Sequence, residues 1–280
     1  MNKNISLFNK SPFLRKLSQG LHYKASRSGP HRLIFLVVHG NEICGVKAFL
    51  RLENQISAML KSGSLEVIIA NPAAFLLQSR SLNKDLNRSF MDNVSNSYES
   101  QRCELLKSSI RNADIFLDIH STSSSGPPFV LPGNHGDHLA KAMPVNLVIR
   151  NLAQQCHGTT ISIADEHKVQ SVVVECGQHQ DNSAVEVAAE CIEALIRQDS
   201  ENCIDSDNPS KQIIDCPQSI IADEGFEFVS SVSFMQSFVK GELVARSNTR
   251  EYRCPFPKAY ILMPNADPKE GEEAFYWGIK

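Results

Sequence analysis

Hydrophobic residues in the first two thirds of the chain fall into short runs, and longer mixed segments separate these runs. Five runs rich in Ile, Val, Leu or Phe have the length of strands buried on both faces, and they span residues 33–38, 65–70, 114–119, 159–163 and 171–174. The segments between them have the length and spacing of helices, at residues 44–60, 98–110, 137–156 and 183–197. This alternation predicts an α/β fold.

A polar segment, QDSENCIDSDNPSK, covers residues 198–211 and has the composition of a linker. The hydrophobic runs after it are interrupted by glycine and proline, as in SIIA, FEFVSSVSF, ELVAR and AYILMP. This pattern is typical of short strands, so we expect a β-rich unit of roughly 70 residues. The predicted domains are residues 1–200 and residues 212–280.

The composition is that of a globular protein, because 42% of the 280 residues are hydrophobic and 21% are charged. A net charge of −3 and the lack of a Lys/Arg block argue against a nucleic-acid binder. No stretch has the length needed to cross a bilayer, and the N-terminal sequence MNKNISLFNKSPFLRKL lacks the apolar core of a signal peptide. The eight cysteines are scattered without a CxxC pair. We therefore expect a cytoplasmic protein with reduced thiols, and with neither a membrane nor nucleic acid as partner.

Several common active sites are missing from the sequence, which contains no GxGxxG, Walker A, GxSxG or HExxH motif. What remains is a set of polar residues at the ends of predicted strands, where sites gather in open α/β sheets. His39 and Glu42, in the segment VVHGNE, follow the first strand. This three-residue step across a turn suits two ligands of a zinc ion. Alternatively, Asn41 caps the next helix and Glu42 complements its dipole.

His120 ends the strand IFLDI and supplies a second imidazole. A set of two histidines and one glutamate leaves one position open for water, which is the ligand pattern of catalytic zinc. Asp118 projects to the same face of the strand as His120 and could support the metal site. Considered singly, His120 can also be a polar residue that opens the loop STSSSG.

A short loop after the second strand concentrates charge. Within NPAAFLLQSRSLNKDLNRSF, residues 71–90, lie Arg80, Asp85, Asn87 and Arg88. Arginine forks pair bidentately with carboxylates, so two arginines near a metal could hold an anionic substrate group and polarise a carbonyl. Without the flanking ligands, DLNR is better explained as a helix start with a solvated arginine.

Glu175 ends the apolar strand VVV. A carboxyl at such a position is paired, or desolvated with a raised pKa, or both. Beside an activated water it is a natural general base. In the alternative interpretation, Glu175 is a strand-terminal glutamate that points into water.

The other histidines offer a weaker hypothesis. The HxxH spacing of His135 and His138 in GNHGDH could chelate a different metal, although a polar loop and helix start explains this segment better. His157, His167 and His179 are more typical of surface or satisfied histidines. His167 could still contact substrate, because it lies between two predicted strands close to Glu175.

These motifs, taken in order, resemble the succinylglutamate desuccinylase and aspartoacylase family, relatives of the zinc carboxypeptidases. The resemblance rests on HGNE, then NP with R-x4-D-L-N-R, then DIH, then VVVECG, which together span residues 37 to about 180. The segments KGELVA, KAYILMP and GEEAF resemble the family's C-terminal domain. The fold implied is a carboxypeptidase-like α/β/α domain with a mixed sheet, followed by a small β domain.

The resemblance also implies a role for each site residue. His39, Glu42 and His120 would bind one zinc ion, and Glu175 would be the general base and acid. Arg80 would stabilise the oxyanion, with Asp85 supporting its loop. Asn87 and Arg88 would grip the substrate carboxylate.

One departure from the family concerns substrate. Aspartoacylases carry an arginine ten residues before the catalytic glutamate, and here Asp165 stands at that offset, with His167 and Lys168 close by. Specificity for aspartate is therefore not predicted. The tail also offers no clear match to the family tyrosine, although Tyr252, Tyr260 and Tyr276 lie around it.

The resemblance and the residues together predict a zinc hydrolase that cleaves the amide of an N-acyl amino acid with a free carboxylate, and homo-oligomers are compatible with this prediction. A metallocarboxypeptidase acting on short peptides needs the same groups. The third hypothesis is a protein that binds a metal and an acylated ligand without catalysis. Glu175 and Arg80 argue against it, because a binding protein needs neither a base nor an oxyanion donor.

Overall fold

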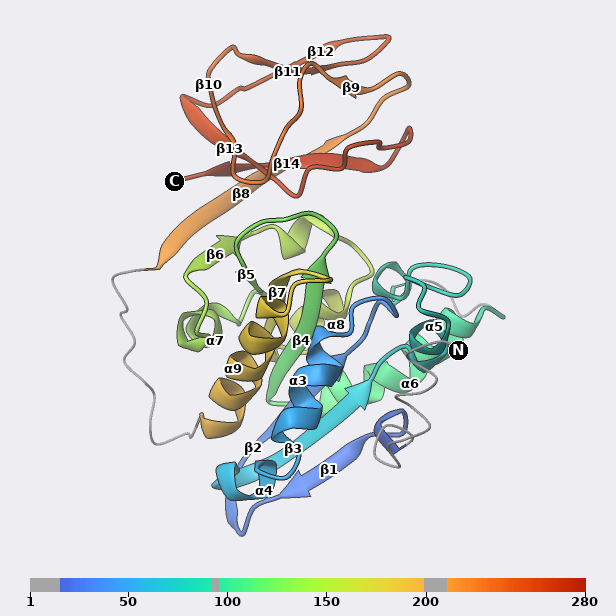
Figure 1. Cartoon of the computed structure of the whole chain (residues 1–280), viewed down its shortest axis with the longest axis vertical. Coiled ribbons are helices and arrows are strands. Elements are labelled where there is room, and N and C mark those ends of the chain that lie inside the picture. The colour runs from blue at the N-terminus through green and yellow to red at the C-terminus, as the bar shows by residue number, and fades with distance from the viewer. Residues whose placement is uncertain (1–15, 92–95, 199–210) are drawn as a thin grey trace. The chain divides into compact units, whose positions relative to one another are not determined.

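The computed structural model describes residues 16–91, 96–198 and 211–280, which form two compact units (Figure 1). The first contains residues 16–148, 156–198 and 211, and the second contains residues 149–155 and 212–280. Most of the predicted linker and most of the N-terminal sequence MNKNISLFNKSPFLRKL lie outside the described residues, so the domain boundaries stay predictions. Among the described residues, no helix has the length and hydrophobicity to cross a membrane.

A mixed sheet forms the centre of the first unit. Its strands are β1 (Leu21–Lys24), β2 (Arg27–Leu36), β3 (Ser62–Ile69), β4 (Ile115–Thr122), β5 (Phe129–Pro132), β6 (Leu147–Arg150) and β7 (Gln170–Gln178). They are ordered β1-β3-β2-β4-β7-β5-β6. Strands β3, β2, β4 and β7 run parallel, whereas β1 on β3 and β5 on β7 are antiparallel. The prediction of an α/β fold with a mixed sheet is confirmed.

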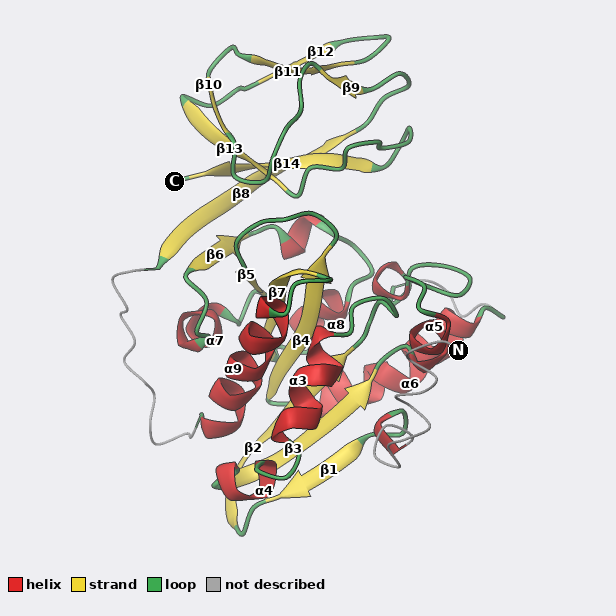
Figure 2. Cartoon of the chain, in the orientation of Figure 1, coloured by secondary structure: helices red, strands yellow, loops and turns green. Residues whose placement is uncertain are grey.

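Helices cover both faces of this sheet (Figure 2). On one face, α3 (Cys44–Leu52) and α4 (Ile56–Met59) pack against α9 (Ser183–Arg197). On the other face, α6 (Tyr98–Asn112) packs against α8 (Thr160–Glu166). The other helices of this unit are short: α5 (Pro72–Leu77), η1 (Leu86–Arg88) and α7 (Asp137–Ala142). The short helix η2 (Ala153–Gln155) belongs to the second unit.

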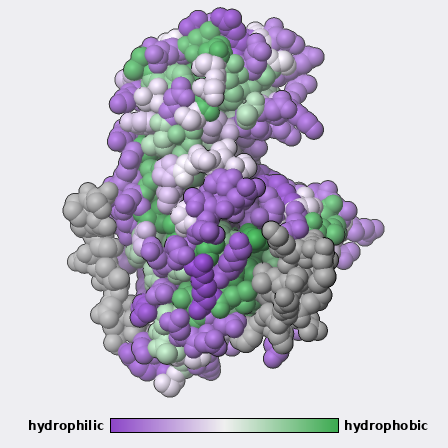
Figure 3. All heavy atoms as spheres, viewed as in Figure 1, coloured by the Kyte–Doolittle hydropathy of each residue, from purple (hydrophilic) through white to green (hydrophobic). Residues whose placement is uncertain are grey.

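The core beneath α6 and α8 is aromatic and aliphatic. Phe35 of β2 and Phe116 of β4 meet edge to face at 4.9 Å between ring centroids, and Leu106 and Ile110 of α6 belong to the same cluster. Burial of such side chains supplies about 1.5–3 kcal/mol each. On the surface in view, hydrophilic residues dominate and hydrophobic residues form smaller patches (Figure 3).

The strand predicted at residues 159–163 is wrong, because this segment begins α8. Thr159 accepts a hydrogen bond from the backbone of Ser162, and the Ser162 side chain bonds back to the backbone of Thr159. This capping box satisfies two backbone donors at the helix start. Its buried residues follow helical spacing: Thr160, Ile161, Ile163 and Ala164. Capping and burial thus outweigh the β-propensity of isoleucine and threonine.

The helix predicted at residues 137–156 is also wrong beyond Ala142. Helix α7 ends there, Pro144 follows, and Leu147 begins β6, which pairs with β5. The helix predicted at residues 44–60 is divided into α3 and α4 by a turn. Strands β1 and β5 are not predicted by the sequence pattern, because both are only four residues long.

The second unit is β-rich, as predicted. One antiparallel sheet has the order β8 (Gln212–Ile221), β14 (Glu273–Ile279), β13 (Lys258–Leu262), β10 (Ser237–Val239). The other has the order β12 (Glu251–Arg253), β11 (Leu243–Arg246), β9 (Glu227–Phe228). Phe275 and Trp277, whose rings lie edge to face at 5.1 Å, are buried in its core.

The strand order positions the candidate site. After β2 the chain crosses to β3 on one side, and it later returns to place β4 on the other side of β2. The carboxyl ends of β2 and β4 therefore flank a topological switch point, where open α/β sheets place their ligands.

Candidate metal centre

The loop that carries His39 begins with a strained residue. Val37, which is fully buried, adopts a positive φ of 61°, which is rare for a β-branched side chain. Gly40 then passes so close to α5 that a Cβ there would lie 2.1 Å from the carbonyl carbon of Ala74. The Gly40 N–H also donates to the Arg80 carbonyl at 3.1 Å. Backbone contacts thus fix the turn between His39 and Glu42.

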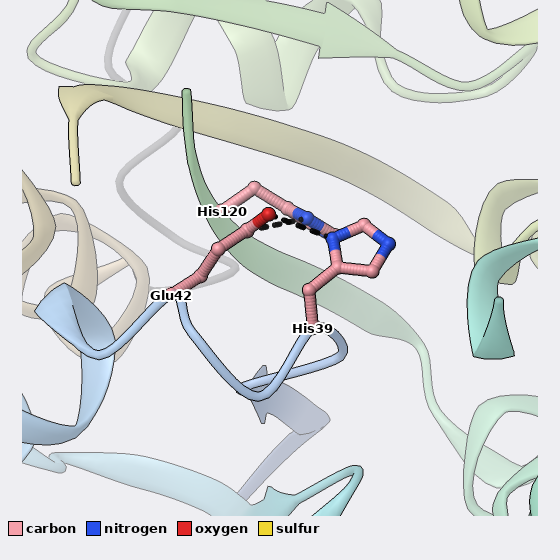
Figure 4. Close-up of side chains that lie close together, drawn as sticks. All are labelled: His39, Glu42 and His120. Carbon is pink, nitrogen blue, oxygen red and sulfur yellow. Dashed lines mark hydrogen bonds and ion pairs between the residues drawn. The ribbon is translucent and has the colours of Figure 1, made fainter. Parts of the chain in front are cut away.

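His39, Glu42 and His120 converge on one point (Figure 4). The Nδ1 atom of His39 lies 2.8 Å from Oε1 of Glu42, and the Nδ1 atom of His120 lies 3.0 Å from Oε2. All three side chains are buried. Their ligand atoms lie within 4.8 Å of one another, and among the described residues they are the group that meets this criterion for a metal site.

Each imidazole also faces a second carboxylate on its far side. Nε2 of His39 lies 3.1 Å from Oδ1 of Asp85, and Nε2 of His120 lies 3.1 Å from Oδ2 of Asp118. A metal-bound histidine typically donates its other N–H to a carboxylate, and His39 makes such a hydrogen bond to Asp85. The Nε2 atom of His120 lies at ion-pair distance from Asp118, outside hydrogen-bond geometry. With a cation at the Nδ1 atoms, each imidazole keeps one proton for its outer carboxylate, so the residues fit a divalent metal.

The charges of the cluster support the same conclusion. Burial lowers the pKa of His39, but the carboxylates of Glu42 and Asp85 outweigh it and raise that pKa above its usual value. Burial acts likewise on His120, and Asp118 and Glu42 raise its pKa well above the usual value. Burial raises the pKa of Glu42, yet the two imidazoles hold it well below its ordinary range. The carboxylates therefore require positive charge between them, from protons or from a cation.

Glu175 lies beside the cluster. It is paired in register with His120 across the parallel β4 and β7, so the two side chains project to the same face. Burial raises the pKa of its carboxyl to about 7. Its Oε2 atom is buried and makes no hydrogen bond to the described residues. A carboxyl with this pKa can take up and release a proton near neutral pH.

The loop after α5 brings Arg80 and Asp85 to the same centre. Nε and Nη2 of Arg80 donate to Oδ2 of Asp85 at 3.1 and 2.7 Å, and Nη1 lies 3.8 Å from Oε1 of Glu42. Arg80 is 52% exposed and so remains accessible to a ligand. Burial raises the pKa of Asp85, but His39 and Arg80 outweigh it and hold that pKa well below its usual range.

Asn87 and Arg88 lie on η1, directly after Asp85 caps it. The Asn87 side chain is nearly buried, and its Oδ1 accepts from the Thr160 N–H at 3.0 Å. Arg88 is exposed, with Nη1 donating to the Asn87 carbonyl at 3.0 Å. The roles of these residues, like those of the other site residues, stay predictions.

The structure does not bring His167 to the centre. It caps the C-terminus of α8 and precedes β7, whereas Glu175 lies toward the other end of that strand. Nε of Arg111 donates to its Nε2 at 3.1 Å. The interpretation that His167 lies between two strands fails with the strand predicted at residues 159–163. His135 and His138 are exposed and belong to no cluster of metal-ligand atoms among the described residues.

Sequence reasoning missed three residues that support the centre. Thr160 donates its hydroxyl to Oδ2 of Asp118 at 2.7 Å. Glu99 is fully buried and accepts from the N–H groups of Leu82 and Asn83, which fixes the loop between Arg80 and Asp85. His179 contacts Asn41 in the loop after β2 and Ser121 at the end of β4. Glu99 looks in the sequence like an ordinary acidic residue in the first turn of a helix.

Comparison with protein-family models gives a match to the succinylglutamate desuccinylase/aspartoacylase catalytic domain over residues 28–197. A probable aspartoacylase from Nostoc sp. is 31% identical over 132 residues, which are 42% of this chain and 44% of that protein. An N-acyl-aromatic-L-amino acid amidohydrolase (carboxylate-forming) from Xenopus tropicalis is 31% identical over 144 residues, or 45% of each chain. The matched segments thus span less than half the length of these relatives.

Solved structures show the same fold. Succinylglutamate desuccinylase from Vibrio cholerae superposes with a TM-score of 0.77 at 18% identity, covering 93% of this chain and 85% of that one. The product-bound ectoine utilization protein EutE (DoeB) from Ruegeria pomeroyi gives 0.70 at 20% identity, covering 93% and 88%. Since the family model covers more than half of the sequence, the chain belongs to the succinylglutamate desuccinylase/aspartoacylase family.

Proposed function

We propose that this protein is a zinc-dependent hydrolase that cleaves the amide bond of an N-acyl amino acid. The observation that carries the proposal is the convergence of His39, Glu42 and His120, with the carboxyl of Glu175 in register beside His120. Membership of the family supports the reaction class, because the relatives matched include aspartoacylases and an N-acyl amino acid amidohydrolase.

Zinc is the metal that this ligand set favours, since two imidazole nitrogens and one carboxylate oxygen leave a position open in a catalytic zinc site. Bound by these residues, zinc would act as a Lewis acid and would lower the pKa of a neighbouring water to about 7. Asp85 and Asp118 hold the two imidazoles in the orientation that directs Nδ1 toward Glu42.

Glu175 is the proposed general base and acid. It removes a proton from the attacking water and delivers it to the leaving amine nitrogen. Its position supports this role, because the carboxyl is buried, its Oε2 atom makes no hydrogen bond within the described part of the chain, and burial raises its pKa to about 7.

Arg80 is the proposed oxyanion donor. Its guanidinium lies 3.8 Å from Glu42 at the edge of the cluster, and the fork to Asp85 orients it. Arg88, exposed on η1, is the proposed partner of the substrate α-carboxylate, with Asn87 beside it. Arginine forks match carboxylates in bidentate geometry.

We further propose that α8 does not recognise a carboxylate on the side chain of the substrate's amino acid. Asp165 stands ten residues before Glu175, and its Oδ1 accepts from the Asn134 N–H at 2.7 Å. The acidic side chain thus fixes a turn and offers no cation there. We therefore do not expect the protein to prefer N-acylaspartate over other N-acyl amino acids.

The test is a hydrolysis screen with the zinc-loaded protein, in which the acyl group and the amino acid vary independently and release of primary amine is measured. Short peptides form a parallel set, which distinguishes a deacylase from a carboxypeptidase. We expect amine release from at least one N-acyl amino acid, and loss of that activity with a chelator. No release from any member of the set contradicts the proposal.

A second measurement tests the role of Glu175. E175Q should retain stoichiometric zinc by elemental analysis and lose about 10²- to 10⁴-fold in kcat, which is the usual contribution of acid–base catalysis. E166Q, which alters an exposed glutamate of α8, is the matched control and should keep wild-type turnover. Near wild-type kcat in E175Q would remove Glu175 from the mechanism.

A further inference from the structure

His179 connects three segments that the proposed chemistry uses. It follows β7, four residues after Glu175, and it is partly buried. Its Nδ1 atom lies 2.9 Å from the hydroxyl of Ser121, and its Nε2 atom lies 3.4 Å from the side-chain amide nitrogen of Asn41. One imidazole therefore contacts the loop after β2 and the end of β4.

Both partners of His179 are adjacent to proposed metal ligands. Asn41 directly precedes Glu42 in the tight turn after β2, and Ser121 directly follows His120. The Ser121 N–H also donates to Oε2 of Glu42 at 3.0 Å, which is the oxygen that lies 3.0 Å from Nδ1 of His120. A displacement of Ser121 would thus move both a ligand and a hydrogen bond that orients another ligand.

The backbone alone does not secure this part of the sheet. The pairing of β4 with β7 is regular up to His120 and Glu175 and then shifts register before Thr122 pairs with Gln178. Gly177 lies in the extra step with a positive φ of 111°. The ladder resumes where the His179 N–H donates to the Thr122 carbonyl at 2.9 Å. Irregular pairing of this kind redirects side chains next to active sites, but it removes ladder hydrogen bonds there.

The imidazole of His179 suits a bridging role. Burial lowers its pKa, and the positive charges of Arg80, His39 and His120 act in the same direction against the attraction of Glu42. A neutral imidazole offers one donor and one acceptor. Its two polar neighbours can use both, with Nδ1 toward Ser121 and Nε2 toward Asn41.

We infer that His179 is a positioning residue of the metal centre, which through Asn41 and Ser121 holds the Glu42 turn and the His120 strand end in register with Glu175. This inference rests on the proposed function, because it assigns His179 to a centre that binds zinc. His179 does not contact the metal ligands directly.

The test measures zinc affinity rather than activity alone. Metal-free wild type and H179A are titrated with Zn²⁺ against a chromophoric chelator, and the Co²⁺-substituted proteins are compared by visible absorption, which reports ligand geometry. We expect H179A to bind zinc about 10- to 100-fold more weakly, as is usual when the outer partners of a metal site are removed. The Co²⁺ bands should also shift.

Conservative variants separate the bridge from general damage. H179N places an amide nitrogen at the Nδ1 position and keeps the contact to Ser121, so it should recover much of the lost affinity. N41A removes the other contact, and in a double mutant with H179A its effect should be smaller than in wild type, because both substitutions break the same bridge. H138A, which removes an exposed histidine of α7, should bind zinc like wild type.

The outcomes are distinguishable. Zinc affinity and a Co²⁺ spectrum in H179A equal to those of wild type would overturn the inference and leave the proposed function intact. Full additivity of N41A and H179A would also overturn it. A wild-type protein that binds no stoichiometric zinc would overturn the proposed function, and this inference with it. If H179A does not fold, H179N, N41A and S121A give the same comparison.

Discussion

At the scale of single residues, the carboxyl of Glu175 makes the stability of the metal-free protein depend on pH. Burial raises its pKa from 4.5 to about 7, so between these values the folded chain keeps a proton that the unfolded chain has released. Stability rises with pH only where the unfolded state binds more protons, and here it binds fewer. The neutral carboxyl therefore makes its full contribution to the free energy of unfolding below pH 4.5, and this contribution is lost as the pH rises through 7.

E175Q removes this dependence because glutamine stays neutral. In urea denaturation of metal-free protein, we expect E175Q and wild type to have similar stability near pH 4.5 and E175Q to be the more stable of the two above pH 7. E166Q serves as the exposed control. Parallel pH profiles of wild type and E175Q would show that the carboxyl is not desolvated.

Substitutions of Arg80 and Arg88 should change different kinetic constants. R80A should lower kcat by about 10²- to 10³-fold, because oxyanion donors act mainly in the transition state. R88A should chiefly raise KM for substrates with a free carboxylate, because a carboxylate clamp holds the ground state and the transition state alike. Steady-state kinetics of both variants, at equal zinc content, measure this difference. An unchanged KM in R88A would assign Arg88 to another role.

At the scale of elements, α8 shows how one capping residue determines a helix that supports the site. Thr159 is buried and caps α8, whose first residue, Thr160, donates to both Asn87 and Asp118. T159A should destabilise the protein by about 1 kcal/mol, the usual cost of a lost N-cap. T159S keeps the hydroxyl and should be close to wild type in equilibrium denaturation. Equal losses in both variants would mean that the methyl group, not the cap, matters.

The end of β2 is a second feature at this scale. A valine at a positive φ is unfavourable by itself, and such strain persists only where the surrounding structure determines the conformation. Here the N–H of Asn71 donates to the Val37 carbonyl at 3.0 Å, and Gly40 fits against Ala74. The turn that directs His39 toward Glu42 therefore depends on contacts with α5 and with its N-cap residue, Asn71.

At the scale of the whole molecule, zinc should stabilise the folded chain, because its ligands come from segments that only the fold brings together. A ligand at 1,000 times its Kd adds about 4.1 kcal/mol. We expect zinc to raise the thermal midpoint of metal-free wild type and not that of H39A or H120A. Mg²⁺, which prefers oxygen ligands, is the control ion. A zinc shift in H39A equal to that of wild type would contradict the ligand set.

Most of the sheet and the positions of the site residues could be predicted from the sequence. Strands β2, β3, β4 and β7 are apolar runs, and buried parallel strands have this composition whatever their neighbours. His39, His120 and Glu175 follow or end such runs. A polar residue at the end of a buried strand is visible in one dimension, and parallel strands bring such ends to one edge of a sheet.

The wrong secondary-structure predictions share one cause, which is that tertiary contacts decide the conformation of these segments. Residues 159–163 have strand-like composition, but a capping box and burial of one helical face determine α8. Strand β6 depends on pairing with β5, which the sequence does not encode locally. His167 is far from the centre for a different reason, because it precedes β7 and Glu175 lies toward the other end of that extended strand.

The sequence by itself determined the α/β class, the four strand ends and the chemical types of the candidate ligands, because hydrophobic periodicity and residue identity are local properties. Only the tertiary structure decided that Asp85 stands behind the imidazole of His39, that Glu99 fixes the arginine loop and that His179 joins three strand ends. These contacts join residues far apart in the chain. Their geometry depends on strand order, on one irregular step in the ladder and on a strained turn, none of which the spacing of residues records.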